Sequence, residues 1–505
     1  MMIVGGLQGT ETSDSMPKAP TDLDAGFVAH TAGRLSEARR WYEQALALEP
    51  GNCRALFLLG TLHAAENRTA RAIAFFEKCI GLHPSLSIAH NALGNALHAA
   101  REIPRAAAEY RRAIDCPEPC VEAFCNLGAI CRSLGQLDEA VSLYRRALVI
   151  QPDLVEAWCN LGVALKELKR LDDATDAFRQ AIGIKPDLAE AHFNESLLLL
   201  LKGDFLPGWP KHEYRWATVQ RTARRHFTPP LWLGDSSLEG KTILVHAEQG
   251  LGDTLQFVRY LPLLEQRGAK VILEVQPALK TLFFEDPRVQ CLYARGETLP
   301  AFDAHCPLLS LPLAFSTGLD SIPGDVPYLH VPDFHRRKWD GLLRTSAGPR
   351  VGFVWFGNRQ HRNDLNRSIP ASAAGRFLEE SPVVLHCLQK DIVNPEDAAL
   401  AASPKMKCLT DQMEDFCDTA AFVERLDLVI TVDTSVAHLA GGLGRPLWVL
   451  LPYVPDWRWL LERNDSPWYP RARLFRQPAA QDWTSVLRLV RDELESFCFG
   501  WKPHA

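Results

Sequence analysis

Residues Val429–Pro446, "VITVDTSVAHLAGGLGRP", change from an apolar, β-branched run to three polar residues and then to small residues that stop at Gly-Arg-Pro. The apolar run is typical of a buried strand in a parallel sheet. Asp433, Thr434 and Ser435 are residue types that cap the start of a helix, and Gly444 with Pro446 would end that helix. This stretch therefore predicts a strand, a tight turn and a helix whose first free N–H groups can bind an anion.

Other short apolar runs in the second half of the chain show the same strand-then-helix order. They read "TILVHAE", "VILEV", "RVGFVWFG", "PVVLHCLQ" and "PLWVLLP". Such alternation predicts parallel sheets with helices on their faces. We expect an N-terminal α/β subdomain at 241–335 and a C-terminal one at 350–480, with a cleft between them, and a final helix and tail at 481–505. Ligands of such sheets bind at the carboxyl ends of the strands.

The first half of the chain repeats with a period of 34 residues. An alanine recurs in each unit, and an aromatic residue follows four positions later, at Tyr42, Phe76, Tyr110, Tyr144 and Phe178. A glycine keeps the same register. This pattern resembles the tetratricopeptide repeat, in which each unit is a pair of antiparallel helices. We expect a disordered N-terminus at 1–20, an all-α superhelix of these repeats with a capping helix at 21–216, and a linker at 217–240.

Three asparagines share one register of the repeat, namely Asn126, Asn160 and Asn194. Stacked repeats form a superhelix whose concave face binds extended peptides. A side-chain amide both donates and accepts hydrogen bonds, so an asparagine ladder could hold a peptide backbone without reading its sequence. The alternative is that asparagine is merely common at this place in the repeat and is solvated. A protein partner in the groove is therefore one of two interpretations.

Composition and charge exclude several classes of protein. The net charge of −6 and the isoelectric point of about 6.3 favour neither nucleic acid nor an anionic membrane as a partner. The run Leu197–Leu201 is too short to span a bilayer, and the N-terminus lacks the pattern of a signal peptide. We therefore expect a cytoplasmic protein. The 13 cysteines form no CxxC pair, and the group from Cys116 to Cys131 suits buried small side chains better than a metal site.

Two further loops follow expected strands. In "HAEQGLGDTLQF", Gly250 and Gly252 permit a tight turn and Asp253 starts a helix, where an aspartate often serves only as a cap. The loop "GNRQHRNDLNRSIP" sets Arg359, His361, Arg362 and Arg367 against a single acid, Asp364. Such a cluster could clamp a diphosphate through bidentate guanidinium contacts, or it could be a solvated basic loop. Glu248, Gln389, Lys390 and Asp391 lie at other strand ends and are weaker candidates.

Together, "GLGDTLQFVRYLPLL" and "DLVITVDTSVAHLAGGLGRP" resemble glycosyltransferase family 9, the ADP-heptose:lipopolysaccharide heptosyltransferases. The resemblance covers roughly 241–478 and departs from the family at Ser435, where the family has glycine. It implies the GT-B fold, in which two Rossmann-like subdomains bind the acceptor and the nucleotide sugar. Asp253 lies where the family has its proposed catalytic base. The donor-binding residues that we predict are Asp433, Thr434, Ser435, His438, Arg367, Arg362, Asn358, Gly252, Gln389 and Lys390.

Repeats placed before a GT-B domain are also similar in architecture to the O-linked N-acetylglucosamine transferases. We therefore expect an inverting glycosyltransferase that moves a sugar from a nucleotide-sugar donor to a hydroxyl, on a protein held by the repeats. The second half has no DxD triplet, so we expect no metal and no cofactor besides the donor. Two alternatives stay open: a scaffold with an inactive transferase-like domain, and a transferase whose acceptor is a glycan or a lipid-linked sugar. The oligomeric state stays open as well.

Overall fold

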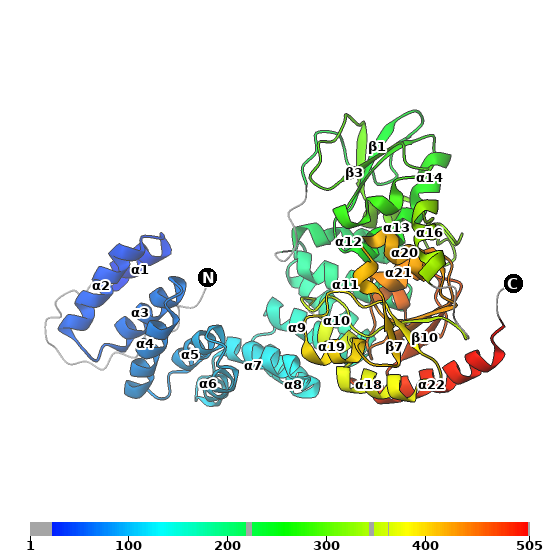
Figure 1. The fold of residues 1–505 in the computed structure, drawn as a ribbon. Helices are drawn as coiled ribbons and strands as arrows, with labels where there is room; N and C mark the ends of the chain where they lie inside the picture. Colours follow the sequence, from blue (N-terminus) through cyan, green and yellow to red (C-terminus); the bar gives the residue numbers. More distant parts are fainter. Residues whose placement is uncertain (1–22, 219–224, 343–347, 362, 503–505) are drawn as a thin grey trace. The chain divides into compact units, whose positions relative to one another are not determined.

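The computed structural model describes residues 23–218, 225–342, 348–361 and 363–502. The predicted disordered segment 1–20 and part of the predicted linker lie outside these residues. The chain divides into two compact units between Leu168 and Lys169 (Figure 1). Each unit is described by itself below.

The first unit consists of helices that pack in consecutive pairs. Their bounds are α1 Leu23–Thr31, α2 Leu35–Leu48, α3 Cys53–Ala65, α4 Thr69–Leu82, α5 Ser87–Ala99, α6 Ile103–Asp115, α7 Val121–Ser133, α8 Leu137–Ile150 and α9 Val155–Glu167. Each 34-residue repeat thus corresponds to one pair of helices, as the sequence predicts.

The recurring glycine and aromatic residue explain why each pair closes. A Cβ atom placed on Gly60 or Gly94 would lie 2.5 Å from a ring carbon of Phe76 or Tyr110, which is closer than real contacts allow. Only glycine therefore lets the ring of the second helix lie on the backbone of the first. Each ring therefore packs against the first helix of its own repeat.

Four cysteines of this unit are either buried thiols or part of a disulfide. Burial raises the pKa of the Cys120 and Cys125 thiols to about 12, so both stay protonated at neutral pH. Cys53 on α3 and Cys79 on α4 form a disulfide, which the sequence analysis did not predict.

The second unit begins with the last helices of the repeat region. These are α10 Leu171–Ile184, α11 Ala189–Lys202, α12 Phe205–His212 and the short 3-10 helix η2 Glu213–Ala217. Phe205 and Trp209 are only 1% and 2% exposed, and both rings lie against Trp457 of the α/β region. The Trp209 indole also donates to the Thr317 carbonyl at 2.8 Å. The sequence analysis ended the repeat domain at 216, but these apolar contacts join its last helices to the α/β region.

The first α/β lobe is a four-stranded parallel sheet. Its strands are β1 Thr242–His246, β2 Lys270–Val275, β3 Cys291–Ala294 and β4 Ala304–Pro307, in the order β3-β2-β1-β4. Helices α13 Leu251–Phe257 and α14 Leu261–Gln266 follow β1, and α15 Leu311–Ala314 follows β4. Successive strands run outward in one direction from β1 and then change sides at β4. The crevice for a ligand in such a sheet lies between these two strands.

The second lobe is a six-stranded parallel sheet. Its strands are β5 Val351–Val354, β6 Leu385–Cys387, β7 Met406–Cys408, β8 Leu428–Val432, β9 Leu447–Leu451 and β10 Ala472–Arg476, in the order β10-β9-β8-β5-β6-β7. This is the doubly wound order, and its crevice lies between β5 and β8. The helices are α17 Asp364–Arg367, α18 Ala371–Glu380, α19 Pro395–Ala401, α20 Phe416–Glu424, α21 Ser435–Gly442 and α22 Trp483–Gly500.

The two lobes share one apolar core instead of facing each other only across an open cleft. One buried cluster includes Ile243 and Leu273 of the first sheet and Val429 and Val449 of the second. Helices α13 and α21 lie side by side between the sheets (Figure 1). Polar groups that meet between the lobes are therefore held by a packed frame.

The charged stretch between the lobes belongs to the second lobe. It forms α16, Asp333–Leu342, which packs on α20. Lys338 bonds to Asp418 at 2.7 Å, and the Trp339 and Phe422 ring centroids are 4.8 Å apart. The sequence analysis ended the first lobe at 335, but these contacts attach the start of α16 to the second lobe.

No helix among the described residues is both long enough and apolar enough to cross a lipid bilayer.

Replacing Trp209 with alanine tests the junction between the repeat end and the lobes. We expect Trp209→Ala to lower the free energy of unfolding by about 3–5 kcal/mol, because it removes a buried ring and its hydrogen bond. Urea denaturation followed by circular dichroism measures the change. Leu206 on the same helix is 58% exposed, so Leu206→Ala is the matched control, with an expected change within about 0.5 kcal/mol. Equal effects of the two variants would contradict the assignment of this junction.

Candidate active site

Charged side chains meet where strands of both lobes end. After β1, Asp253 lies in the first turn of α13, and after β5, Arg367 ends α17. Asp433 follows β8, and Arg458 lies in the short 3-10 helix η8 (Trp457–Trp459) after β9. Asp253 and Arg458 form an ion pair across the lobes. Arg367 donates to the Asp433 carbonyl oxygen at 3.3 Å. The two crevices of the parallel sheets therefore contribute to one polar cluster.

Asp253 has both of its carboxylate oxygens engaged. Its Oδ2 accepts the Gly250 N–H at 2.8 Å, which caps α13, and its Oδ1 accepts Arg458 Nη2 at 2.6 Å. The cap that the sequence analysis considered is thus present. The ion pair orients the same carboxylate between the lobes, which is where a proton acceptor for an interlobe substrate would have to lie.

Arg458 is the centre of the cluster, and the sequence analysis missed it. The residue is 9% exposed, and it donates from Nε to Gln256 at 2.6 Å and from Nη1 to Asp456 at 2.8 Å. Its guanidinium lies 4.3 Å from the ring centroid of Trp457. Burial alone would lower the pKa of Arg458, but the charges of Asp456 and Asp253 raise it, so the side chain stays charged. The signal in the sequence was the Asp-Trp-Arg triplet after β9.

The start of α21 is partly exposed at Asp433, Thr434 and Ser435. The Thr434 hydroxyl accepts the Val436 N–H at 3.3 Å, so Thr434 is the cap that its residue type predicts. A Cβ atom on Gly252 would lie 2.7 Å from His438 Cδ2. Gly252 is therefore needed for the close approach of α13 to α21.

Asp433 and Arg367 set the charge of this helix start. Burial raises the pKa of Asp433 to about 6, the charge of Asp456 adds to the rise, and Arg367 opposes it. The buried Nε of Arg367 makes no hydrogen bond to the described residues and lies 3.8 Å from Asp364. A guanidinium with unused hydrogen-bonding capacity beside a helix start suits an anionic ligand.

His438 is enclosed by neighbouring side chains of the second lobe, and its predicted contact with the donor stays a prediction. It is 5% exposed, its Nδ1 lies 2.7 Å from the Tyr469 hydroxyl, and its ring stacks on Trp459. Burial, aided by the charge of Arg458, lowers the pKa of His438 to about 3, so the ring is neutral at ordinary pH.

The basic residues of the loop after β5 have different surroundings. Arg359 turns to Asp397 of α19 at 2.8 Å and lies over Phe356, away from Asp433. His361 lies at the surface. Nearby protein atoms desolvate its ring in part, and this desolvation and the charge of Arg367 lower its pKa. Arg362 lies outside the described residues. Arg367 is therefore the member of this loop that the structure brings to the start of α21.

Three other residues that we predict to contact the donor form hydrogen bonds to backbone groups of the protein. Asn358 is exposed and its side chain accepts the Gln360 N–H at 2.9 Å. Gln389 is buried and accepts the Phe356 N–H at 3.2 Å. Lys390 donates to the Met413 carbonyl at 2.5 Å. These bonds shape the loops after β5 and β6, and donor contact by these three residues stays a prediction.

The aromatic residues after β9 do not offer a free face to a nucleotide base. Trp457, Trp459, Trp468 and Tyr469 are each at most 4% exposed. These rings pack the interface between the lobes.

The asparagine register occupies equivalent places on α7, α9 and α11. Asn126 donates to Asn91 at 2.9 Å and to Asn95 at 3.1 Å within the first unit. Asn160 in the first unit and Asn194 in the second are partly exposed. The amide of Asn126 is thus engaged by its own unit, while peptide contact by the other two stays a prediction.

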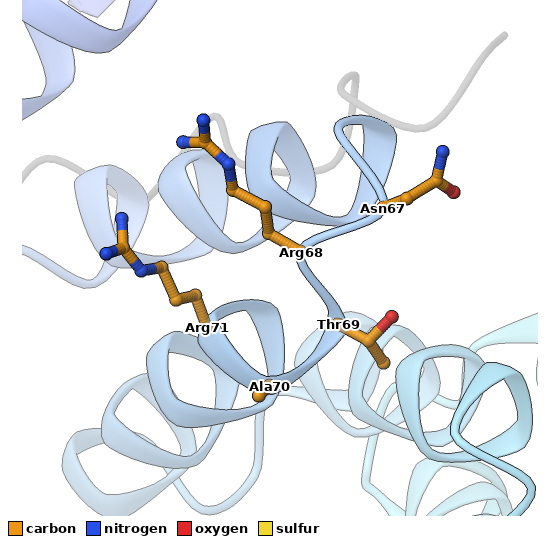
Figure 2. A pocket seen from close by; sticks show the side chains of 5 residues that line it. All are labelled: Asn67, Arg68, Thr69, Ala70 and Arg71. Carbon is orange, nitrogen blue, oxygen red and sulfur yellow. The ribbon is translucent and has the colours of Figure 1, made fainter.

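A surface hollow in the first unit is separate from these residues. It lies at the turn between α3 and α4 and is lined by Asn67, Arg68, Thr69, Ala70 and Arg71 (Figure 2). None of the predicted site residues belongs to it.

Models of the tetratricopeptide repeat match residues 24–87, 128–169 and 155–188. The helices of the first half are tetratricopeptide repeats. Protein FlbA of Caulobacter vibrioides is 24% identical over 328 residues, which cover 60% of this chain and 55% of that protein. The chain thus spans about half the length of this curated relative. A match of this length is longer than segment 1–240, so it extends into the α/β half.

Several solved repeat proteins are also similar to part of the chain. MamA is 26% identical with a TM-score of 0.30, and the match covers 33% of this chain and 96% of MamA. PilW, a type IV pilus biogenesis factor, is 18% identical with a TM-score of 0.37, and the match covers 41% of this chain and 96% of PilW. YrrB, described as a TPR protein with an unusual peptide-binding site, is 21% identical with a TM-score of 0.30, over 34% of this chain and 89% of YrrB.

Replacing Asp433 with asparagine tests the charge of the helix start. The pKa of Asp433 is raised from 3.8 to about 6 in the fold, so the unfolded chain loses this proton first and stability falls between about pH 4 and pH 6. We expect Asp433→Asn to raise the free energy of unfolding by about 1–2 kcal/mol more at pH 7 than at pH 4. Urea denaturation at both pH values measures this difference. Asp235→Asn, at an exposed position, is the control. The same change at both pH values would contradict the assignment.

Proposed function

We propose that the α/β lobes form a glycosyltransferase of the GT-B type, which transfers a sugar from a nucleotide-sugar donor with inversion and without a metal. The observation that carries the proposal is the convergence of two crevices, with Asp253 from the first lobe and the start of α21 from the second in one polar cluster. The resemblance of both motifs to glycosyltransferase family 9 supports the same chemistry. A transfer reaction needs such a meeting place, because the acceptor and the donor must react at one point.

The donor diphosphate would bind at the start of α21. Free N–H groups there and the helix dipole favour an anion by about 0.3–2 kcal/mol. The Arg367 guanidinium supplies a full positive charge beside the same turn. Ser435 replaces the glycine of the family, so the ligand would meet a hydroxyl at that position. The raised pKa of Asp433 makes protonation of this carboxylate easier than usual, and uptake of a proton on ligand binding would remove one repulsive charge beside the diphosphate.

Asp253 would accept the proton of the acceptor hydroxyl. Its position between the lobes supports this role, because a diphosphate bound at α21 would hold the reacting carbon near the same polar cluster. Arg458 orients this carboxylate and neutralises charge in the cluster. A positioned base contributes about 10² to 10⁴ in rate, and fixed positive groups stabilise the leaving diphosphate.

The acceptor would be a protein or peptide held by the repeats. Tetratricopeptide repeats commonly bind extended peptides on their concave face, and Asn160 is a partly exposed amide in the predicted register. An acceptor screen would distinguish this proposal from two alternatives. In one, the asparagines are merely solvated, and in the other, the acceptor is a glycan or a lipid-linked sugar.

Replacing Asp253 with asparagine tests the base. We expect Asp253→Asn to lower the transfer rate by about 10² to 10⁴. Donor affinity should change less than about threefold, because the asparagine amide oxygen keeps one of the two bonds that Gly250 and Arg458 donate to Asp253, and the diphosphate would bind at the start of α21. Calorimetry and release of nucleoside diphosphate measure the two quantities, with ADP-heptose and UDP-, GDP- and dTDP-hexoses as the donor panel.

The exposed Asp235→Asn variant is the control and should keep full activity. Retained turnover in Asp253→Asn would remove Asp253 from the role of base. Absence of binding and turnover across the panel in the unmodified protein would favour the scaffold alternative instead.

A further inference from the structure

Arg215 occupies the crevice of the first lobe, although it comes from the end of the repeats. The residue lies on η2 and is 1% exposed. Its Nε donates to Glu248 Oε1 at 3.0 Å and its Nη2 to Glu248 Oε2 at 3.1 Å. The same Nη2 donates to the Ser310 hydroxyl at 2.8 Å. One guanidinium thus ties three separate segments together.

The topology gives these contacts their significance. Glu248 follows β1 and Ser310 follows β4, and the crevice of this sheet lies between these two strands. Arg215 therefore sits at the place where an open sheet of this order binds its ligand. Glu248 belongs to the same loop as Gly250, whose N–H donates to the Asp253 carboxylate.

The chemistry of Glu248 requires such a partner. Its side chain is 5% exposed, and burial raises its pKa to about 7 although the charge of Arg215 opposes the rise. The planar fork of an arginine bonds both oxygens of a carboxylate, and a lysine cannot do so. Glu213 closes the cluster, because its Oε1 accepts bonds from Arg215 Nη1 at 2.6 Å and from the Ser310 hydroxyl at 2.8 Å.

We propose that Arg215 is a positioning residue of the active site. From the segment that ends the repeats, it fixes Glu248 and thereby the β1–α13 loop that presents Asp253. This inference rests on the proposed function for its effect on catalysis. The effect on the loop itself is independent of that function. The segment that ends the repeat region then helps to position the active site of the first lobe.

A second buried arginine of the same lobe is the matched control. Arg288 forms an ion pair with Asp286 and donates to the Tyr328 carbonyl at 2.8 Å, and its side chain is 12% exposed. It has no bond to the β1–α13 loop among those described. Arg288→Gln therefore reports the cost of losing a buried arginine without the proposed effect on Asp253.

The test compares Arg215→Gln, Arg215→Lys, Glu248→Gln, the double variant Arg215→Gln/Glu248→Gln and Arg288→Gln in the full chain. Hydrogen exchange of segment 247–254 is the first readout, and we expect exchange in Arg215→Gln to be at least tenfold faster than in the unmodified protein and in Arg288→Gln. The second readout is nucleoside diphosphate release with the donor panel above. We expect kcat to fall at least tenfold in Arg215→Gln with KM for the donor unchanged, and Arg215→Lys to restore part of it.

The double variant should be no slower than the slower single variant, because both residues act through one contact. Unchanged exchange in the loop, or a kcat of Arg215→Gln within twofold of Arg288→Gln, would overturn the inference. If the unmodified protein turns over no donor, the proposed function fails, while the exchange readout still decides whether Arg215 positions the loop.

Discussion

The packing of α12 against Trp457 is the contact on which the second unit depends. Phe205 and Trp209 bring the end of the repeat region onto this ring, and Phe257 of the first lobe stacks on it as well. Trp457 comes from the loop after β9 of the second lobe. Three parts of the chain that are distant in sequence therefore bury one side chain together. Apolar burial of this size is the main source of stability for such a junction.

Arg458 follows Trp457 directly, so the packing of Trp457 also fixes the position of Arg458 in the polar cluster. A buried arginine costs free energy unless carboxylates surround it. Asp253, Asp456 and Gln256 meet this requirement from both lobes. At the first crevice, the carboxylates of Glu248 and Glu213 surround Arg215 in the same way. Two buried arginines thus hold this part of the first lobe. Arg215 bonds to the loop between β1 and α13, and Arg458 bonds to α13 itself, so Asp253 can be presented without large rearrangement.

Local patterns in the sequence predict most of the architecture, because they depend on neighbouring residues alone. The 34-residue period predicts the helix pairs, and apolar runs such as Val429–Val432 predict the parallel strands. The cap at Thr434 follows from its residue type. Arg458 and Arg215 could not be found this way, since their partners lie far away in the sequence. The surroundings of His438 could not be found this way either, because only the fold shows that Tyr469 and Trp459 enclose its ring.

The central claim is that the start of α21 binds the diphosphate of a nucleotide sugar between the lobes. A crystal structure of the protein soaked with a nucleoside diphosphate from the donor that binds best tests it most directly. The account predicts phosphate oxygens within hydrogen-bond distance of the Thr434 and Ser435 backbone N–H groups and of the Arg367 guanidinium. A diphosphate bound elsewhere, with the start of α21 covered by protein side chains, would contradict it.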